Sequence, residues 1–196
     1  SGKGECKAFY ENGQLQYVYN VVDGLKQGEY NEYYVDGKIK IQATYKDNAL
    51  DGYAIWYFSD GKKDMEGYLK MGKRDGNWTY YYRSNGQKGS EGAYSNDKEI
   101  GRWIYYYETS EKWREGDYRN GMRERLWNTY YENGKLHHKG SYVAGKEDGI
   151  WESYFENGEI NTRGRFVEGK MSGKWEVFYP DGSRKTQTDY KEGVKN

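Results

Sequence analysis

The stretch RWIYYYETSEKWREGDYRNG, residues 102–121, returns in altered form as LWNTYYENGKLHHKGSYVAG at residues 126–145. Both stretches have a Trp in second place, adjacent ring residues soon after it, and a Gly two residues before a later Tyr. They begin 24 residues apart, and a fixed period of this length is typical of repeat architectures. We therefore expect the chain to be an array of similar structural repeats.

The same period extends over the whole chain when each repeat starts two places before the Trp position. Six of the seven spacings are 24 residues, and one of 25 reflects a single insertion near residues 83–85. Residues 1–196 are thus interpreted as a single array of eight repeats. The starts are Gly4, Gly28, Gly52, Gly76, Gly101, Arg125, Gly149 and Gly173. The repeats are residues 4–27, 28–51, 52–75, 76–100, 101–124, 125–148, 149–172 and 173–196.

Ring residues and turn residues recur at fixed places in every repeat. The position two places after the start is occupied by Cys6, Tyr30, Ala54, Trp78, Trp103, Trp127, Trp151 and Trp175. Pairs of rings stand five and six places after the start: Phe9-Tyr10, Tyr33-Tyr34, Tyr57-Phe58, Tyr81-Tyr82, Tyr106-Tyr107, Tyr130-Tyr131, Tyr154-Phe155 and Phe178-Tyr179. A turn Gly follows in seven repeats, and Ser110 replaces it in the fifth.

These marks predict one β-hairpin per repeat. Tyr, Trp and Phe favour pleated, half-buried strands. An Asn-Gly or Asp-Gly dipeptide between two such runs, as at Asn133-Gly134, is a strong hairpin signal because both residues can adopt positive φ. Adjacent ring pairs and 27 glycines make helices implausible. The expected fold class is therefore all-β, an elongated, twisted, single-layer antiparallel sheet of about eight hairpins.

Side-chain alternation along a strand assigns the rings to two faces. The Trp position lies on one face, and the first ring of each pair lies on the other. A second set of glycines stands two residues before the ring of the second strand. We expect these glycines to let a neighbouring indole lie flat over bare backbone. They are Gly67, Gly92, Gly116, Gly140 and Gly164.

The composition limits the function. Leu, Ile, Val and Phe number only 26, but aromatic residues make up 18% and supply apolar area in their place. Lys plus Arg and Asp plus Glu balance at 31 each, which argues against nucleic-acid binding and against electrostatic docking to anionic lipid. No apolar run approaches the roughly 20 residues that span a bilayer.

No residue pattern points to catalysis, a cofactor or a metal. His137 and His138 occur in one repeat and lack partners at metal-ligand spacing, so we interpret them as surface residues. Cys6 stands alone and is interpreted as a small filler at a Trp position. Glu132 and Glu156 recur at one repeat position, which indicates a turn or solvated role. We therefore expect a protein that is not an enzyme.

The repeat GxWxxYYxNGKxxxxGxYxxGKxDG resembles the MORN repeat variant of bacterial proteins over all eight repeats. The resemblance implies hairpins stacked in a single sheet. Many such proteins are labelled as antitoxin components of toxin–antitoxin systems, and the resemblance extends that label to this chain only loosely. Choline-binding repeats of cell-wall proteins are also similar, but their repeats are shorter and their Trp stands beside the Tyr pair.

A tyrosine ladder on the face opposite the Trp position is the candidate binding surface. Tyr is amphipathic and enriched at interfaces. One hypothesis is that this face only packs as a second half-core; the other is that it binds a partner protein, or alternatively a glycan as a cell-surface module. The candidate residues are Tyr33, Tyr57, Tyr81, Tyr106, Tyr130 and Tyr154.

The ends of the array suggest further expectations. Both ends lie within ordinary repeats, and an open edge strand favours pairing with another chain, including a second copy end to end. The first residue is Ser1 rather than Met. This favours a processed segment of an exported or cell-surface protein over a cytoplasmic one.

Overall fold

The computed structural model describes residues 2–196, and every regular element in this range is a β-strand. The chain divides into two compact units, residues 1–98 and 99–196, which are described separately. The strands of the first unit are β1 (Lys3–Phe9), β2 (Leu15–Val22), β3 (Leu25–Tyr33), β4 (Ile39–Lys46), β5 (Ala49–Leu50), β6 (Gly52–Tyr57), β7 (Lys63–Lys70), β8 (Lys73–Tyr81) and β9 (Lys88–Ser95).

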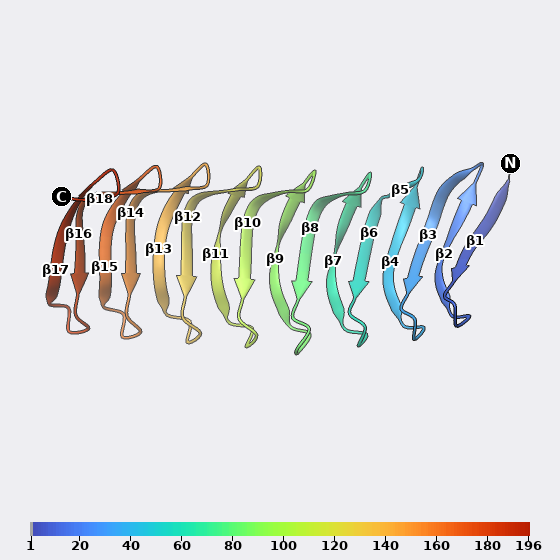
Figure 1. The fold of residues 1–196 in the computed structure, drawn as a ribbon, viewed down its shortest axis with the longest axis horizontal. Helices are drawn as coiled ribbons and strands as arrows, with labels where there is room; N and C mark the ends of the chain where they lie inside the picture. Colours follow the sequence, from blue (N-terminus) through green and yellow to red (C-terminus); the bar gives the residue numbers. More distant parts are fainter. Residues whose placement is uncertain (1) are drawn as a thin grey trace. The chain divides into compact units, whose positions relative to one another are not determined.

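The second unit has the same construction. Its strands are β10 (Lys98–Tyr106), β11 (Lys112–Arg119), β12 (Met122–Tyr130), β13 (Leu136–Val143), β14 (Lys146–Tyr154), β15 (Ile160–Val167), β16 (Lys170–Phe178), β17 (Arg184–Lys191) and β18 (Val194–Lys195). In each unit the strands follow one another in chain order, as Figure 1 shows.

Every strand pairing within a unit is antiparallel. In the first unit β1 pairs with β2, β2 with β3 and β3 with β4, and the order continues through β6, β7 and β8 to β9. The second unit pairs β10 to β18 in the same consecutive way. The predicted all-β fold, built from consecutive antiparallel hairpins in open sheets, is confirmed.

The two turns of each repeat differ in backbone conformation. In the Asn-Gly turn after β12, the amide N–H of Gly134 donates to the carbonyl of Tyr131 (2.9 Å), and only Gly134 has positive φ (79°). Asn133 instead accepts the amide N–H of Lys135 through its side chain (3.0 Å). The dipeptide therefore closes the predicted hairpin with positive φ at the Gly alone. The Asn acts as a side-chain acceptor that closes the loop.

The second turn of each repeat is the one with two residues at positive φ. Ala144 (49°) and Gly145 (82°) form the two-residue loop between β13 and β14. This is the type I′ geometry, whose twist matches that of the strands it joins. In the third, sixth and seventh repeats the sequence concealed this turn, because Met71, Ala144 and Glu168 stand where Asp23 and Asn120 precede a Gly in the first and fifth repeats.

Hydrogen bonds at both ends of the strands join consecutive repeats. At one end, the amide N–H of Gly145 donates to the carbonyl of Arg123 (2.9 Å), and similar bonds recur at other second turns. At the other end, the second ring of a pair uses its hydroxyl: Tyr131 donates to the carbonyl of Tyr154 in the next repeat (2.7 Å). The same bond occurs at Tyr10, Tyr34 and Tyr107.

The core consists of indoles laid over glycines of the preceding repeat. A Cβ added to Gly67 would lie 2.6 Å from the Cε2 atom of Trp78, and the corresponding approaches at Gly116, Gly140 and Gly164 are closer still. The predicted role of these four glycines is confirmed. Each indole N–H also donates to the carbonyl of the residue after the glycine: Trp78 to Tyr68 (2.9 Å), Trp127 to Asp117 (3.1 Å), Trp151 to Ser141 (3.3 Å) and Trp175 to Arg165 (3.2 Å).

Rings of the second strands fill the space between indoles. In the second unit, Tyr142 meets Trp127 and Trp151 edge-on, with ring centroids 6.1 and 5.2 Å apart. Phe166 bridges Trp151 and Trp175 in the same way (5.8 and 5.0 Å). The buried indoles Trp78, Trp103 and Trp127 are only 2, 3 and 4% exposed. We call the face that carries the Trp positions the indole face, and the opposite face the ladder face.

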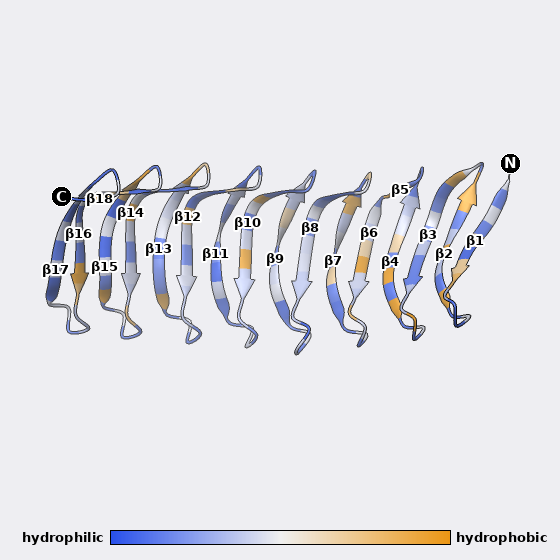
Figure 2. Ribbon diagram, in the orientation of Figure 1, coloured by the Kyte–Doolittle hydropathy of each residue, from blue (hydrophilic) through white to orange (hydrophobic). Residues whose placement is uncertain are grey.

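Hydropathy alone gives a misleading picture of this core. Figure 2 shows mostly hydrophilic strands with short hydrophobic stretches, for example in β4, β6 and β10. The mean hydropathy of the chain is -1.27, because charged residues make up 32% of it and the scale scores Tyr and Trp below zero as well. Each such ring nevertheless buries roughly 150–250 Å². The rings therefore supply the apolar area that the aliphatic residues lack.

The indole–glycine contact predicts a strong coupling between Gly140 and Trp151. Replacing Gly140→Ala forces the ring off the backbone and should cost about 1–3 kcal/mol. In a Trp151→Ala background the same change should cost little, because Ala43 and Ala54 already occupy the equivalent positions in the chain. Urea unfolding of the two single variants and the double variant measures the coupling. Additive losses would contradict the contact.

Arg125 takes the place of a start glycine and has a φ of 60°, a left-handed conformation. The equivalent residues Gly149 and Gly173 have φ values of 89° and 68°. Because this conformation costs an L-residue roughly 1–2 kcal/mol, Arg125→Gly should stabilise the protein by about 1 kcal/mol. The matched change Gly149→Arg should destabilise it. An unfolding midpoint that Arg125→Gly leaves unchanged would mean that the arginine side chain offsets the strain.

Candidate functional site

All six residues of the candidate tyrosine ladder are half-buried. Tyr33, Tyr57 and Tyr81 end β3, β6 and β8 in the first unit, and Tyr106, Tyr130 and Tyr154 end β10, β12 and β14 in the second. Each stands three residues after a Trp position, so it lies on the ladder face of its unit. The structure therefore brings three of the residues to one face in each unit.

The hydroxyls of four ladder residues are bonded to side chains on the same face. Tyr57 donates to Oε1 of Gln42 (2.7 Å). Tyr130 donates to Glu115 (2.7 Å) and Tyr154 to Glu152 (2.6 Å), while Tyr81 donates to Glu66. Each of these four hydroxyls therefore already donates its hydrogen bond within the chain. A ligand on this face would therefore meet ring surfaces and ion pairs rather than free phenol groups.

Glu152 on the ladder face has three side-chain partners. It accepts a hydrogen bond from Tyr154 and ion-pairs with Lys139 (3.0 Å) and Arg163 (2.7 Å), with 13% of its side chain exposed. Burial opposes its ionisation, but the hydrogen bonds from Tyr154, Lys139 and Arg163 outweigh burial and lower the pKa of Glu152 to about 2. Burial and the bond to Glu152 raise the pKa of Tyr154.

Glu115 forms a second cluster of this kind in β11. Its carboxylate accepts from Tyr130 and pairs with Arg102 and Lys112, both at 3.2 Å. Burial raises the pKa of Glu115, but the bonds from these three partners lower it by more. The ladder face thus carries rings held in place by charged networks.

Two exposed rings on the ladder face lie outside the predicted ladder. Tyr53 and Tyr68 are 44 and 52% exposed, and their centroids are 5.0 Å apart in an edge-on contact. They pair across β6 and β7. Sequence reasoning missed them because it considered only the rings that recur in every repeat, and most other repeats carry polar or charged residues at these two positions. That departure from the repeat was the available signal.

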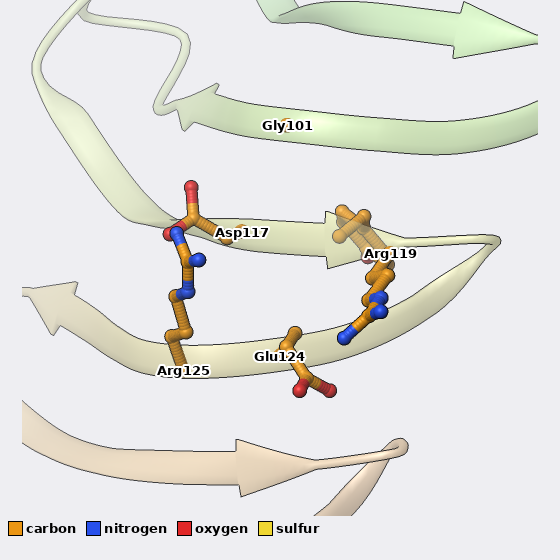
Figure 3. Close-up of a pocket in the computed structure, with 6 residues that line it drawn as sticks. Gly101, Asp117, Arg119, Glu124 and Arg125 are labelled. Atoms are coloured by element: carbon orange, nitrogen blue, oxygen red, sulfur yellow. The ribbon is translucent and has the colours of Figure 1, made fainter.

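A shallow hollow of about 420 Å³ lies in the second unit among β10, β11 and β12. Its lining includes Asp117, Arg119, Glu124 and Arg125, and Figure 3 shows the side chains of Asp117 and Arg125 pointing toward one another. Two acidic and two basic groups balance each other. The side chain of Glu124 also accepts the amide N–H of Ala144 (2.9 Å). The four charged side chains of the hollow therefore cancel in net charge, and one of them, Glu124, also stabilises the adjacent turn.

His137 and His138 belong to a ring cluster on the hairpin of β12 and β13. His137 packs on Tyr131 with centroids 4.3 Å apart, and His138 stacks on Trp151 at 6.3 Å. Burial and the charge of His137 lower the pKa of His138. The interpretation of both histidines as surface residues is therefore wrong: each ring is half-buried, His137 against Tyr131 and His138 against Trp151.

Residues 2–196 also bear on two other kinds of site. In this range no group of three or more His, Cys, Asp or Glu side chains is arranged to hold a metal ion. The same residues include no helix that is long and apolar enough to cross a membrane.

Comparison with protein families gives a match over the repeats. The family model described as the MORN repeat variant matches residues 3–23, 26–47, 126–144, 147–168 and 171–192. These five segments cover more than half of the chain and coincide with the first two and the last three hairpins. A comparison with curated proteins finds no match.

The cluster around Glu152 predicts acid sensitivity. A glutamate with an ordinary pKa of 4.5 that is lowered to about 2 on folding stabilises the protein fully above pH 4.5, and this stabilisation is lost as pH falls toward 2. Glu152→Gln should therefore lower the urea midpoint at pH 7 but much less at pH 2.5. Glu156→Gln, in an exposed turn, is the matched control. Equal losses at both pH values would exclude this linkage.

Proposed function

This chain belongs to the MORN repeat variant family, and we propose that it is a non-catalytic scaffold that binds a partner protein through its ladder face. MORN repeats are typically interaction or scaffold modules. We also propose which kind of partner binds and which residues bind it.

The observation that carries the proposal is the exposure of apolar rings on a sheet face that residues 2–196 leave without a second layer. Every regular element of residues 2–196 is a strand of a consecutively paired sheet. The rings of Tyr53 and Tyr68 thus remain open to solvent on the ladder face. Aromatic side chains of this kind are enriched at protein interfaces, where they supply large contact area at low entropic cost.

Rigidity of the surrounding residues favours recognition as well. Ion pairs and tyrosine hydroxyl bonds hold Glu66, Glu115 and Glu152 on the ladder face. A preorganised surface loses little conformational entropy on binding. We also propose that the protein catalyses no reaction. In the antitoxin-like version of the proposal, the bound partner is a bacterial toxin whose surface the scaffold covers.

A glycan-binding surface module is the alternative, and one observation favours it. A hollow of about 320 Å³ in the first unit is lined by Glu29, Asn31, Gln42 and Thr44 beside Tyr53. Amide and hydroxyl groups next to an exposed ring suit a sugar, which presents hydroxyls at its edges and C–H groups on its faces. The two functions require different ligands on the same face.

Capture of partners from the native cell tests the scaffold. A protein retained by the wild-type chain should be lost, or retained at least tenfold more weakly, with Tyr53→Ala/Tyr68→Ala, because both rings are removed from the surface. Tyr179→Ala, at an exposed ring in the last hairpin, is the matched control. A partner that the double variant retains fully would contradict a binding role for these rings.

A polysaccharide array tests the alternative. If the hollow beside Tyr53 and the adjoining ladder residue Tyr57 bind glycan, wild-type protein should be retained on at least one polysaccharide, and Tyr53→Ala/Tyr57→Ala should abolish retention. Urea unfolding of the same variant shows whether the sheet is intact. Retention that survives the loss of both rings would exclude this hollow and Tyr57 as the glycan site.

A further inference from the structure

Two positions on the ladder face are charged in some repeats of the second unit and apolar in others. One is the residue after the repeat start, and the other is the last residue before the second turn. In the fifth and eighth repeats these positions hold Arg102 and Arg119, or Lys174 and Lys191. In the sixth and seventh repeats they hold Leu126 and Val143, or Ile150 and Val167. We call these last four residues the apolar band.

The apolar band is open to solvent. Leu126, Val143, Ile150 and Val167 are 47, 56, 58 and 42% exposed. The neighbouring repeats form the same hairpins with charged residues in these places, so the fold does not require aliphatic side chains there. Single exposed aliphatic residues are common, but a contiguous group of them marks an interaction surface.

Strand register places the four side chains in a zigzag. Leu126 pairs with Ser141, which is two residues before Val143, and Ile150 pairs with Arg165, which is two residues before Val167. The four residues therefore stand on the successive strands β12, β13, β14 and β15, on one face. Neighbouring strands are about 4.8 Å apart, and two residues along a strand span roughly 6.6–6.8 Å.

This spacing fits a helix that lies across the strands. Leu126 and Ile150 are two strands apart, or about 9.6 Å. Residues i and i+7 of a helix are separated by about 10.5 Å along its axis, and the intervening i+3 and i+4 residues alternate about that line. An extended peptide places residues of one face about 6.7 Å apart and does not match strands 4.8 Å apart.

Three exposed basic residues border the band. Lys146 and Lys170 pair across the turns with Val143 and Val167, and Arg165 pairs with Ile150; all three are exposed. The nearby carboxylates Glu124 and Asp148 accept amide hydrogens of the turn residues Ala144 (2.9 Å) and Glu168 (3.2 Å). A segment with carboxylates beside its apolar residues would complement this border.

We propose that the apolar band of β12 to β15 binds an amphipathic helix of a partner protein, with acidic side chains flanking the apolar face of that helix. The proposal rests on the scaffold function and specifies the chemistry of the partner. It also assigns the binding surface in the second unit to residues outside the tyrosine ladder.

A designed peptide tests the band directly. The probe is a fluorescein-labelled 18-residue peptide with apolar residues at i, i+3, i+4 and i+7 and Glu at most other positions. Fluorescence anisotropy should show that the full chain binds it. Leu126→Asn/Ile150→Asn should weaken binding at least tenfold. This variant should fold, because Asn77 holds the equivalent place in the fourth repeat.

Three controls make the result specific. Val35→Asn removes an aliphatic side chain that is 57% exposed in the first unit, and should leave binding unchanged. A peptide of the same composition with strictly alternating apolar residues should bind at least tenfold more weakly. The same weakening is expected when Lys replaces Glu in the probe.

Several outcomes would overturn the proposal: no binding by the wild type, equal binding by the double Asn variant, or equal binding of the alternating or basic peptide. Failure of the scaffold function looks different. If wild type and the double Asn variant retain a native partner equally, the band is not the binding site of that partner, but the scaffold function stands. If the wild-type chain retains no partner, the scaffold function itself is contradicted.

Discussion

The contact of an indole with a bare glycine backbone is the interaction on which the rest of the structure depends. Trp127 lies over Gly116, and its N–H donates to the carbonyl of Asp117. The pairing of β11 with β12 is irregular at this point, between Glu115 and Asp117. The indole therefore supplies apolar contact at the bulge and a donor for a carbonyl there, which explains why a polar group can lie beside a buried ring at low cost.

This contact also explains how a chain with few aliphatic residues forms a core from one layer of strands. Each Trp is covered by rings of adjacent strands, as Trp151 is by Tyr142 and Phe166. Burial of an indole thus requires the neighbouring hairpin, and stability comes from interfaces between successive repeats. Where the glycine is replaced, the Trp is replaced too: Ala43 precedes Ala54, and Tyr19 pairs with Tyr30.

Because the indole face holds the core, the ladder face is free to vary. Its carboxylates are fixed by ion pairs, as Glu152 is by Lys139 and Arg163. Residues that recur in every repeat are explained by the hairpin itself. Residues that depart from the pattern, such as Tyr53, Tyr68 and the apolar band, have no such role, and this is why we assign recognition to them.

The sequence by itself determined the period, the hairpins, the two faces and the glycines beneath the indoles, because these follow from local turn chemistry and from side-chain alternation along one strand. Only the tertiary structure decided which carboxylate each tyrosine contacts, where the indole N–H donates and which turn has two residues at positive φ. Tyr130 reaches Glu115 in the preceding repeat, and the bulge at Gly116 sets that register. The apolar band likewise spans four strands, and such cross-strand neighbours depend on bulges that the spacing of residues along one strand does not encode.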